Sequence, residues 1–347
     1  MTSAAAIVPH FHRQAAYCTT LGSPLTAAVL TTIADLLERA DAPAWTAVLR
    51  DWPGDPGADA LALRVAGALH RAVLDGDAEL AVAYAAGRVD AALIDTVFTR
   101  HPGLLTRYLQ GPPQTNDPLR SAVLLGGFLT IAAATGRPLA LREIGASAGI
   151  NLMWDTYAYD FGSWCFGDPL AAPFLLQAQW QGPQPPAAKI AVHSRAGCDV
   201  QPLDARDPEQ RKRLLSYIWA DQWPRLERVA MALEHAGRGG PPPEQIHAGD
   251  FVARELAARP RDAALVLYHS IVWQYVDPAE QQRIAAAMAA AGQTATAEAP
   301  LAWLRFEPGT AKDGADLSLT LWPGGETRRL AEADYHGRWI RWLNGTA

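Results

Sequence analysis

A short loop of small residues carries the clearest chemical signal in the sequence. Residues 143–149 read Glu-Ile-Gly-Ala-Ser-Ala-Gly, and they overlap the end of a short apolar run, 139–144. Side chains this small let the backbone approach a ligand closely and adopt unusual dihedral angles. A helix expected at 150–157 would point free N–H groups and partial positive charge at the same place. Strand, tight loop and helix in this order predict a ligand site at the carboxyl end of the strand.

The chemistry of the loop suits S-adenosylmethionine, which brings an ammonium, a carboxylate, a sulfonium and an adenosine. Glu143 could attract the ammonium. The amides of the turn suit the carboxylate, and they belong to Gly145, Ala146, Ser147 and Gly149. We therefore expect S-adenosylmethionine as the cofactor of a methyltransferase. Methyl transfer depends mainly on alignment and proximity, so we expect no metal.

Three other interpretations of the loop stay open. A nicotinamide or flavin fingerprint needs Gly-x-Gly-x-x-Gly, but Ser147 occupies the middle position and the third glycine is absent. A serine hydrolase elbow needs Gly-x-Ser-x-Gly, which residues 145–149 match. Asp250 or Asp277 would then be the acid and His336 the base, although that elbow normally follows several strands. A tight turn that binds no ligand is the third alternative.

Polar residues at other strand ends complete the expected site. Asp250 could accept a hydrogen bond from the adenine amino group, or it could cap the helix expected at 251–258. Asp199 could bind the ribose hydroxyls, and a turn aspartate is the alternative. His269 and the adjacent Ser270 follow another strand, and His269 could act as a general base because its pKa lies near neutrality. The alternative for His269 is a ring satisfied by backbone hydrogen bonds.

The second candidate catalytic residue is His336, which could reach over the sheet from an expected final helix. Trp273 and Tyr275 could wall a substrate pocket, although aromatic residues are more often part of a core. We also expect Glu143 and Asp250 to line one crevice, with Glu143 at the ammonium end of the ligand and Asp250 at the adenine end.

The elements that position these residues fall into two parts. In the first third of the chain apolar residues recur with helical spacing, and no alternating strand pattern precedes residue 110. Helices are expected at 24–37, 59–74, 89–98 and 103–109. Gly, Pro and Asn then concentrate at 111–118, which predicts a boundary. We expect a helical domain over 1–115, acting as a lid, and a second domain over 116–347.

The second domain is expected to alternate strands and helices. A buried helix at 119–135 comes first, with Arg120 in a capping or solvent-facing role. Candidate strands follow at 139–144, 189–193, 245–247, 264–269 and 301–306. Helices at 207–235, 251–258 and 278–291 separate them, and a hairpin at 317–331 ends the series. This order predicts an α/β fold with a Rossmann-like, methyltransferase-type sheet, mostly parallel with a terminal antiparallel hairpin.

Composition narrows the classes of partner. The 347-residue chain has a formal net charge of −6 and no block of Lys or Arg, so nucleic acid and anionic membranes are not expected partners. Its three cysteines lie far apart, which disfavours disulfides and structural zinc and favours a reducing cytoplasm. The most apolar stretch, 121–135, is too short to cross a bilayer, and no signal-peptide pattern is evident.

Five separated motifs resemble those of one bacterial family. They are Gln-Thr-Asn-Asp at 114–117, Glu-Ile-Gly-Ala-Ser-Ala-Gly-Ile-Asn-Leu at 143–152, Arg-Ala-Gly-Cys-Asp at 195–199, His-Ser-Ile-Val-Trp-Gln-Tyr at 269–275 and His-Gly-Arg-Trp at 336–339. Over nearly its whole length the chain is similar to the family catalogued as domain of unknown function 2332, which is grouped with Rossmann-like methyltransferase folds. The resemblance implies that fold and marks as residues to test Asn151, Asp155, Asp199, Asp250, His269 and His336.

The leading expectation is a cytoplasmic, S-adenosylmethionine-dependent methyltransferase that acts on a small-molecule acceptor. A serine hydrolase using Ser147 and a non-catalytic binding protein for a nucleotide metabolite are the alternatives. The candidate catalytic residues are His269 and His336. The candidate cofactor-binding residues are Glu143, Gly145, Ala146, Ser147, Gly149, Asn151, Asp199, Asp250 and Ser270.

Overall fold

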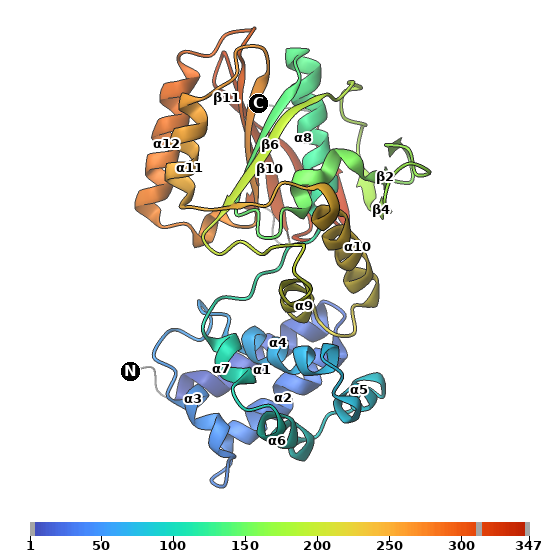
Figure 1. Ribbon diagram of the computed structural model, residues 1–347, viewed down its shortest axis with the longest axis vertical. Helices are drawn as coiled ribbons and strands as arrows, with labels where there is room; N and C mark the ends of the chain where they lie inside the picture. Colours follow the sequence, from blue (N-terminus) through green and yellow to red (C-terminus); the bar gives the residue numbers. More distant parts are fainter. Residues whose placement is uncertain (1–3, 310–313, 344–347) are drawn as a thin grey trace. The chain divides into compact units, whose positions relative to one another are not determined.

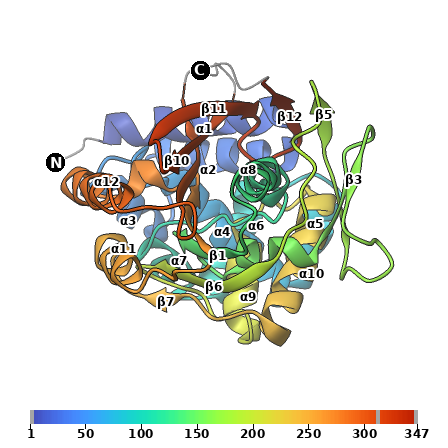
Figure 2. The same ribbon diagram turned by 90° about the horizontal axis from the view of Figure 1, so that it is seen from above.

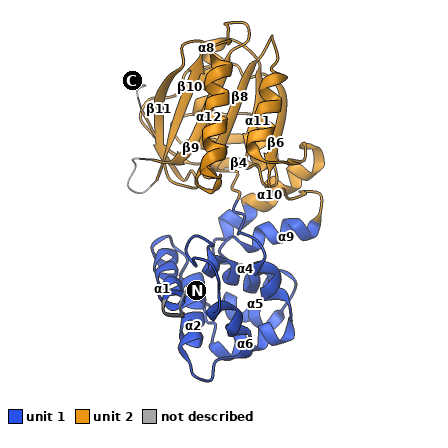
Figure 3. Cartoon of the chain, turned by 90° about the vertical axis from the view of Figure 1, so that its left-hand side faces the viewer, with its two compact units in different colours: residues 1–115, 208–227 blue, residues 116–207, 228–347 orange. Residues whose placement is uncertain are grey.

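The computed structural model describes residues 4–309 and 314–343, and the chain divides into two compact units (Figure 3). The helical unit comprises Met1–Thr115 together with Pro208–Glu227, and the α/β unit comprises Asn116–Asp207 together with Arg228–Ala347. The sequence predicts a second domain that runs unbroken from 116 to 347. The structure differs, because it assigns residues 208–227 to the helical unit.

Short amphipathic helices surround one apolar core in the helical unit. They are α1 (Ala4–Thr20), α2 (Pro24–Glu38), the 3-10 helix η1 (Ala44–Thr46), α3 (Ala47–Arg50), α4 (Leu61–Leu74), α5 (Ala78–Ala85), α6 (Ala91–Arg100), α7 (Leu104–Leu109) and α9 (Pro208–Ser216). Asp77 and Asp90 each accept a hydrogen bond from a backbone N–H group of the helix that follows, so they cap α5 and α6. Phe11, Leu30 and Leu69 are among the side chains that fill the core.

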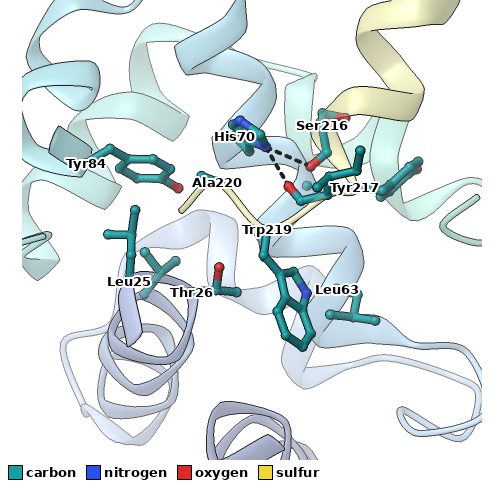
Figure 4. A pocket seen from close by; sticks show the side chains of 13 residues that line it. Leu25, Thr26, Leu63, His70, Tyr84, Ser216, Tyr217, Trp219 and Ala220 are labelled. Atoms are coloured by element: carbon teal, nitrogen blue, oxygen red, sulfur yellow. Dashed lines mark hydrogen bonds between the residues drawn. The ribbon is translucent and has the colours of Figure 1, made fainter. Parts of the chain in front are cut away.

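The segment 208–227 joins the helical unit through specific contacts (Figure 4). Nδ1 of His70 lies 2.9 Å from the carbonyl oxygen of Ile218 and 3.3 Å from that of Ser216. The ring of Tyr217 packs against Gly67, where a Cβ atom would lie only 2.8 Å from Cδ1 of that ring. The space left at this joint is about 10 Å³, which is the size of a single water molecule. We therefore interpret it as a packed joint and not as a ligand pocket.

A nine-stranded sheet forms the centre of the α/β unit (Figures 1 and 2). In spatial order its strands are β5 (Gln179–Gln181), β12 (Trp339–Trp342), β11 (Glu326–Ala333), β10 (Ala315–Trp322), β9 (Leu301–Pro308), β8 (Ala264–Ser270), β1 (Leu139–Ile144), β6 (Val192–Asp199) and β7 (Glu244–Gln245). All neighbours from β9 to β7 are parallel, whereas β9, β10, β11 and β12 pair antiparallel. An α/β fold with a mostly parallel sheet is therefore confirmed.

Helices cover both faces of this sheet. Helices α11 (Ala248–Ala257) and α12 (Pro278–Gly292) cover one face, and α8 (Arg120–Thr135) covers the other (Figure 2). Ile144 of β1 and Phe251 of α11 share the apolar core on the first face. On the second face Gly127 lets α8 approach closely, since a Cβ atom there would lie 2.4 Å from Cδ1 of Leu304.

Several local elements differ from the sequence expectation. The residues after the small-residue loop form a 3-10 helix, η2 (Ile150–Thr156), in place of an α-helix. The expected final helix is strand β12, and His336 lies in the turn before it. The expected helix at 207–235 is two helices, α9 and α10 (Trp223–Gly239). A second sheet contains β2 (Ala158–Asp160), β3 (Cys165–Phe166) and β4 (Leu175–Gln177).

The length and hydropathy of the helices bear on membrane insertion. Across residues 4–309 and 314–343, no helix is both long and apolar enough to cross a bilayer.

Candidate functional site

A pocket of about 260 Å³ lies at the carboxyl ends of the parallel strands. The ends of β1, β6 and β7 contribute to it, and the segment after β8 completes it. Along the sequence, the strands that follow β1 in the large sheet are added first on its β6 side and then on its β8 side. Open α/β sheets bind ligands where the strand order reverses in this way. The pocket is lined by Ile144, Gly145, Cys198, Asp199, Val200, Ile246, His247, Ala248, Val272, Tyr275, Val276, Asp277 and Glu280.

The turn after β1 has a left-handed backbone. The φ angle is +67° at Gly145, +52° at Ser147 and +73° at Gly149. Gly145 lines the pocket and has no room for a side chain, because a Cβ atom would lie 2.5 Å from Cγ2 of Val272. Glycine is therefore required at this position both for its dihedral angle and for the close packing of the segment after β8.

The amides of this turn point into the fold. The N–H of Ala146 donates to the carbonyl of Cys198 at 3.0 Å, and the N–H of Gly149 donates to the carbonyl of Ala146 at 2.7 Å. The N–H of Ser147 donates to Oδ2 of Asp199 at 2.9 Å. The following η2 is also a seven-residue 3-10 helix, which is too short to present a strong helix dipole. We therefore do not assign a carboxylate site to these three amides.

Asp199, like Gly145, is a predicted cofactor-binding residue that lines the pocket. It ends β6, and its carboxylate is half-buried beside the turn after β1. Oδ2 accepts from Ser147, as described above, and Oδ1 accepts from the N–H of Gln201 at 2.9 Å. Each carboxylate oxygen has a further lone pair, so Asp199 can still accept hydrogen bonds from a ligand.

Asp250 lies outside the pocket. Its side chain is 57% exposed and forms an ion pair with Arg283 at 2.8 Å. It belongs to the first turn of α11, whose N-cap is His247. A carboxylate at this position interacts favourably with the helix dipole, and it does not reach an adenine in the pocket. His247 and Glu280 line the pocket instead, and Oε1 of Glu280 accepts from the N–H of Gly249 at 2.8 Å.

Both ring nitrogens of His269 are engaged inside the protein. The indole N–H of Trp303 donates to Nε2 at 3.2 Å, which assigns the proton to Nδ1. Nδ1 then donates to Oε1 of Glu307 at 2.6 Å, and the ring stacks on Trp273 with centroids 4.8 Å apart. The buried ring has no free nitrogen for a substrate, so this geometry favours the satisfied histidine over the general base. Ser270, the next residue, is buried and does not line the pocket.

Glu307 is a residue that the sequence interpretation missed. Besides His269, its Oε1 accepts the N–H of Val272 at 3.1 Å, and it thereby holds the segment in which Ile271 has a φ of +53°. The sequence signal that could have identified Glu307 is its position at the end of β9. The carboxyl ends of neighbouring parallel strands meet at one edge of the sheet, where ligand sites form.

Glu143 lies on the opposite face of the sheet from Asp250. Side chains alternate along β1, so Ile144 faces the core of α11 and Glu143 faces the side covered by α8. The hydroxyl of Tyr268 donates to Oε2 of Glu143 over a long 3.5 Å. Burial raises the pKa of Glu143 to about 8. The expectation that Glu143 and Asp250 line one crevice is therefore wrong.

Asn151 belongs to a buried polar cluster beside the turn. Its Nδ2 donates to Oδ1 of Asn116 at 2.8 Å, and Nδ2 of Asn116 donates to the carbonyl of Ala146 at 3.0 Å. Asp155, which the resemblance also marks, forms an ion pair with Arg195 at 2.7 Å. We interpret Asp155 as a structural residue.

The base that a serine hydrolase needs is not next to Ser147. Within the described part of the chain, the buried Oγ of Ser147 has no hydrogen-bond partner. Nδ1 of His336 lies 4.0 Å from Oδ2 of Asp117, and Asp277 caps α12 through the N–H of Ala279. The three members of the expected triad are therefore not joined by hydrogen bonds.

Comparison with known proteins gives a family without an assigned activity. A family model described as "Uncharacterized protein conserved in bacteria (DUF2332)" matches residues 9–342. Searches of curated proteins and of solved structures found no match.

Proposed function

We propose that this chain, which belongs to the DUF2332 family of uncharacterised bacterial proteins, binds S-adenosylmethionine in the pocket at the strand ends. It would then transfer the methyl group to a small-molecule acceptor. The observation that carries the proposal is the carboxylate of Asp199, which ends β6 inside the pocket and beside the glycine turn after β1.

The pocket has the chemical character that a nucleoside requires. Asp199 offers acceptor positions for two ribose hydroxyls, while Val200 and Ile246 provide apolar surface for the faces of a base. Tyr275 stands at the mouth with 73% of its surface exposed, where its ring can stack. A volume of about 260 Å³ is closer to one nucleoside than to a dinucleotide, which favours S-adenosylmethionine over a nicotinamide or flavin cofactor.

Methyl transfer demands little acid–base chemistry from the protein. When bound, the cofactor would supply an electrophilic methyl group to a nucleophilic atom of the acceptor. The chain has to fix the ribose through Asp199, hold the turn at Gly145 and exclude water. We assign no general base, because His269 has both ring nitrogens engaged.

Calorimetry with S-adenosylhomocysteine tests the proposal. The wild-type protein should bind it in the micromolar range, about 7–8 kcal/mol. Asp199→Ala should weaken binding roughly tenfold or more, because a charge-assisted acceptor is lost. Asp250→Ala is the matched control and should bind like the wild type, because Asp250 lies outside the pocket. A folded wild-type protein that gives no binding heat at millimolar ligand would overturn the proposal.

A further inference from the structure

Arg120, the first residue of α8, is a buried cation that forms no ion pair among the described residues. It is 6% exposed, and its Nε donates to the carbonyl oxygen of Tyr335 at 3.1 Å. Among the residues that the structure describes, its terminal nitrogens have no hydrogen-bond partner and no carboxylate lies within 4.0 Å. A buried cation without an ion pair is costly, so a bound anion would stabilise this side chain.

The acidic residues that act on Arg120, namely Asp117, Asp334 and Glu307, already have partners within the fold. Both oxygens of Asp117 accept from Arg228 at 2.9 Å, and Asp334 is bound by Arg338 at 2.7 Å. Glu307, the third acidic residue that acts on Arg120, accepts from His269 and from the N–H of Val272, so none of the three forms an ion pair with Arg120.

Two unused acceptors belong to a buried polar cluster that Asn116 connects to the start of α8. Oδ1 of Asn151 and Oγ of Ser147 are buried and have no partner among the described residues. Asn116 ties these acceptors to the start of α8, because it bonds both Asn151 and the carbonyl before Ser147. Glu143 is close enough for the charge of Arg120 to lower the pKa of its carboxyl against the larger effect of burial.

We propose that these residues, the Arg120 cluster of Asn116, Arg120, Glu143, Ser147 and Asn151, bind the α-amino-carboxylate head group of a ligand. The guanidinium of Arg120 would hold the carboxylate by paired hydrogen bonds. Oδ1 of Asn151 and the carboxyl of Glu143 would accept from the ammonium. This assignment gives partners to the terminal nitrogens of Arg120 and to Oδ1 of Asn151.

Charge balance favours a zwitterion over a phosphate. Arg120 is one cation, and the carboxylates of Asp117, Glu307 and Asp334 also act on it, so a second negative charge would be repelled. A phosphate dianion would need more donors than one guanidinium, since the nearby amides of the turn are already bonded within the fold. An ammonium and a carboxylate on one carbon match both halves of the cluster.

Two sources could supply such a head group, namely the amino-acid end of S-adenosylmethionine or a free amino acid. Only the first source rests on the proposed function. The two are distinguished by titrating S-adenosylhomocysteine, 5′-methylthioadenosine, which lacks the head group, and the common L-amino acids at millimolar concentration. Each is measured with wild type, Arg120→Met, Asn151→Leu and the control Arg254→Gln, which removes an exposed arginine paired with Glu244.

For a cofactor-borne head group, wild type should bind S-adenosylhomocysteine roughly tenfold or more tightly than 5′-methylthioadenosine. Arg120→Met should reduce that ratio to about one and leave the binding of 5′-methylthioadenosine unchanged. For a free head group, one amino acid should bind to wild type and to Arg254→Gln, and binding should be lost in Arg120→Met and weakened in Asn151→Leu.

The subsite and the proposed function fail in different ways. If both adenosine compounds bind equally and no amino acid binds, the subsite is wrong and the pocket stands. If an amino acid binds through Arg120 and neither adenosine compound does, the proposed function is wrong and the subsite stands. The subsite is also wrong if Arg120→Met changes neither the affinity ratio of the two adenosine compounds nor the affinity for an amino acid. It is wrong as well if none of the compounds binds.

Stability of the free protein separates a ligand-binding arginine from a structural one. Arg120→Met removes an unpaired buried charge and keeps most of the volume, so its melting temperature should equal or exceed that of wild type. Arg120→Lys keeps the charge without the planar fork and should bind the head group with intermediate affinity. A marked fall in melting temperature for Arg120→Met, with unchanged binding, would make Arg120 a structural residue.

Discussion

The backbone N–H of Ser147 donates to Oδ2 of Asp199, 52 residues further along the chain, over 2.9 Å. This bond joins the turn after β1 to the end of β6. The other carboxylate oxygen of Asp199 is oriented by the N–H of Gln201. A ligand at Asp199 would therefore meet an acceptor that two backbone donors already hold in place.

Ser147→Ala should not destabilise the protein. The change removes a buried hydroxyl that has no partner among the described residues, so the free energy of unfolding should stay the same or rise by up to about 1 kcal/mol. Thr320→Ala is the control, because its buried hydroxyl bonds Thr327 at 2.7 Å, and it should lose about 1–2 kcal/mol. Urea unfolding measures both, and a larger loss in Ser147→Ala would contradict the assignment.

An esterase assay on the Ser147→Ala protein addresses the hydrolase alternative. The structure shows no base at the hydroxyl, so wild type and variant should hydrolyse a nitrophenyl ester at the same low rate. A collapse of activity by several orders of magnitude in the variant would identify Ser147 as a nucleophile.

Glu143→Gln should stabilise the protein at alkaline pH. Burial raises the pKa of Glu143 from 4.5 to about 8, so the folded state holds this proton more tightly than the unfolded chain does. The stability that this proton contributes is fully present below about pH 4.5, and it is lost as the pH rises through about 8. The neutral amide of the variant avoids that loss.

Unfolding experiments from acidic to alkaline pH measure this effect. The variant should gain on the wild type as the pH rises, by a few kcal/mol above about pH 8. Glu326→Gln changes an exposed glutamate and is the control. A constant difference between wild type and Glu143→Gln across the range would mean that Glu143 is not a buried, protonated group.

Glu307→Ala should destabilise the segment after β8. It removes the acceptor of both the Nδ1–H of His269 and the N–H of Val272, at a cost of about 2–3 kcal/mol. Glu307→Gln keeps an acceptor oxygen and should cost less. Hydrogen exchange at the Val272 amide reports the change directly, and unaltered protection in Glu307→Ala would contradict this role.

Gly67→Ala should destabilise the helical unit. The added Cβ atom would lie 2.8 Å from the ring of Tyr217, so the side chain that joins segment 208–227 to this unit would have to move, at about 1–3 kcal/mol. Gly239→Ala, in α10, adds a Cβ where no neighbouring atom lies within 4 Å, and it should be neutral or stabilising. Equal stability of the two variants would refute the packing argument.

Local patterns in the sequence predict much of the α/β unit correctly. The run of small residues after an apolar strand predicts the turn at Gly145, because its conformation depends on side-chain size over a few residues. Asp199 is predicted at the end of a strand for a similar reason, although β6 lies further along the chain than expected.

Long-range packing accounts for the residues that the sequence placed wrongly. The turn at His336 is followed by a strand, because Trp339–Trp342 pairs with β11 and with β5, a partner about 160 residues away that no local period reveals. The face on which Glu143 points depends on the register of β1 by a single residue. The partners of His269 come from β9, so its satisfied ring could not be read from neighbouring positions.

The discontinuous helical unit has a consequence for protein synthesis. Residues 1–115 leave the ribosome well before residues 208–227, which supply the contacts to His70 and Gly67. Strands β1 and β6 are therefore translated before the helical unit has all its residues. N-terminal domains generally fold first during translation. Here the helices of residues 1–115 keep part of their apolar surface uncovered until residues 208–227 have been translated. A ribosome-bound chain stopped before residue 208 should accordingly be a better target for chaperones than one stopped after residue 227.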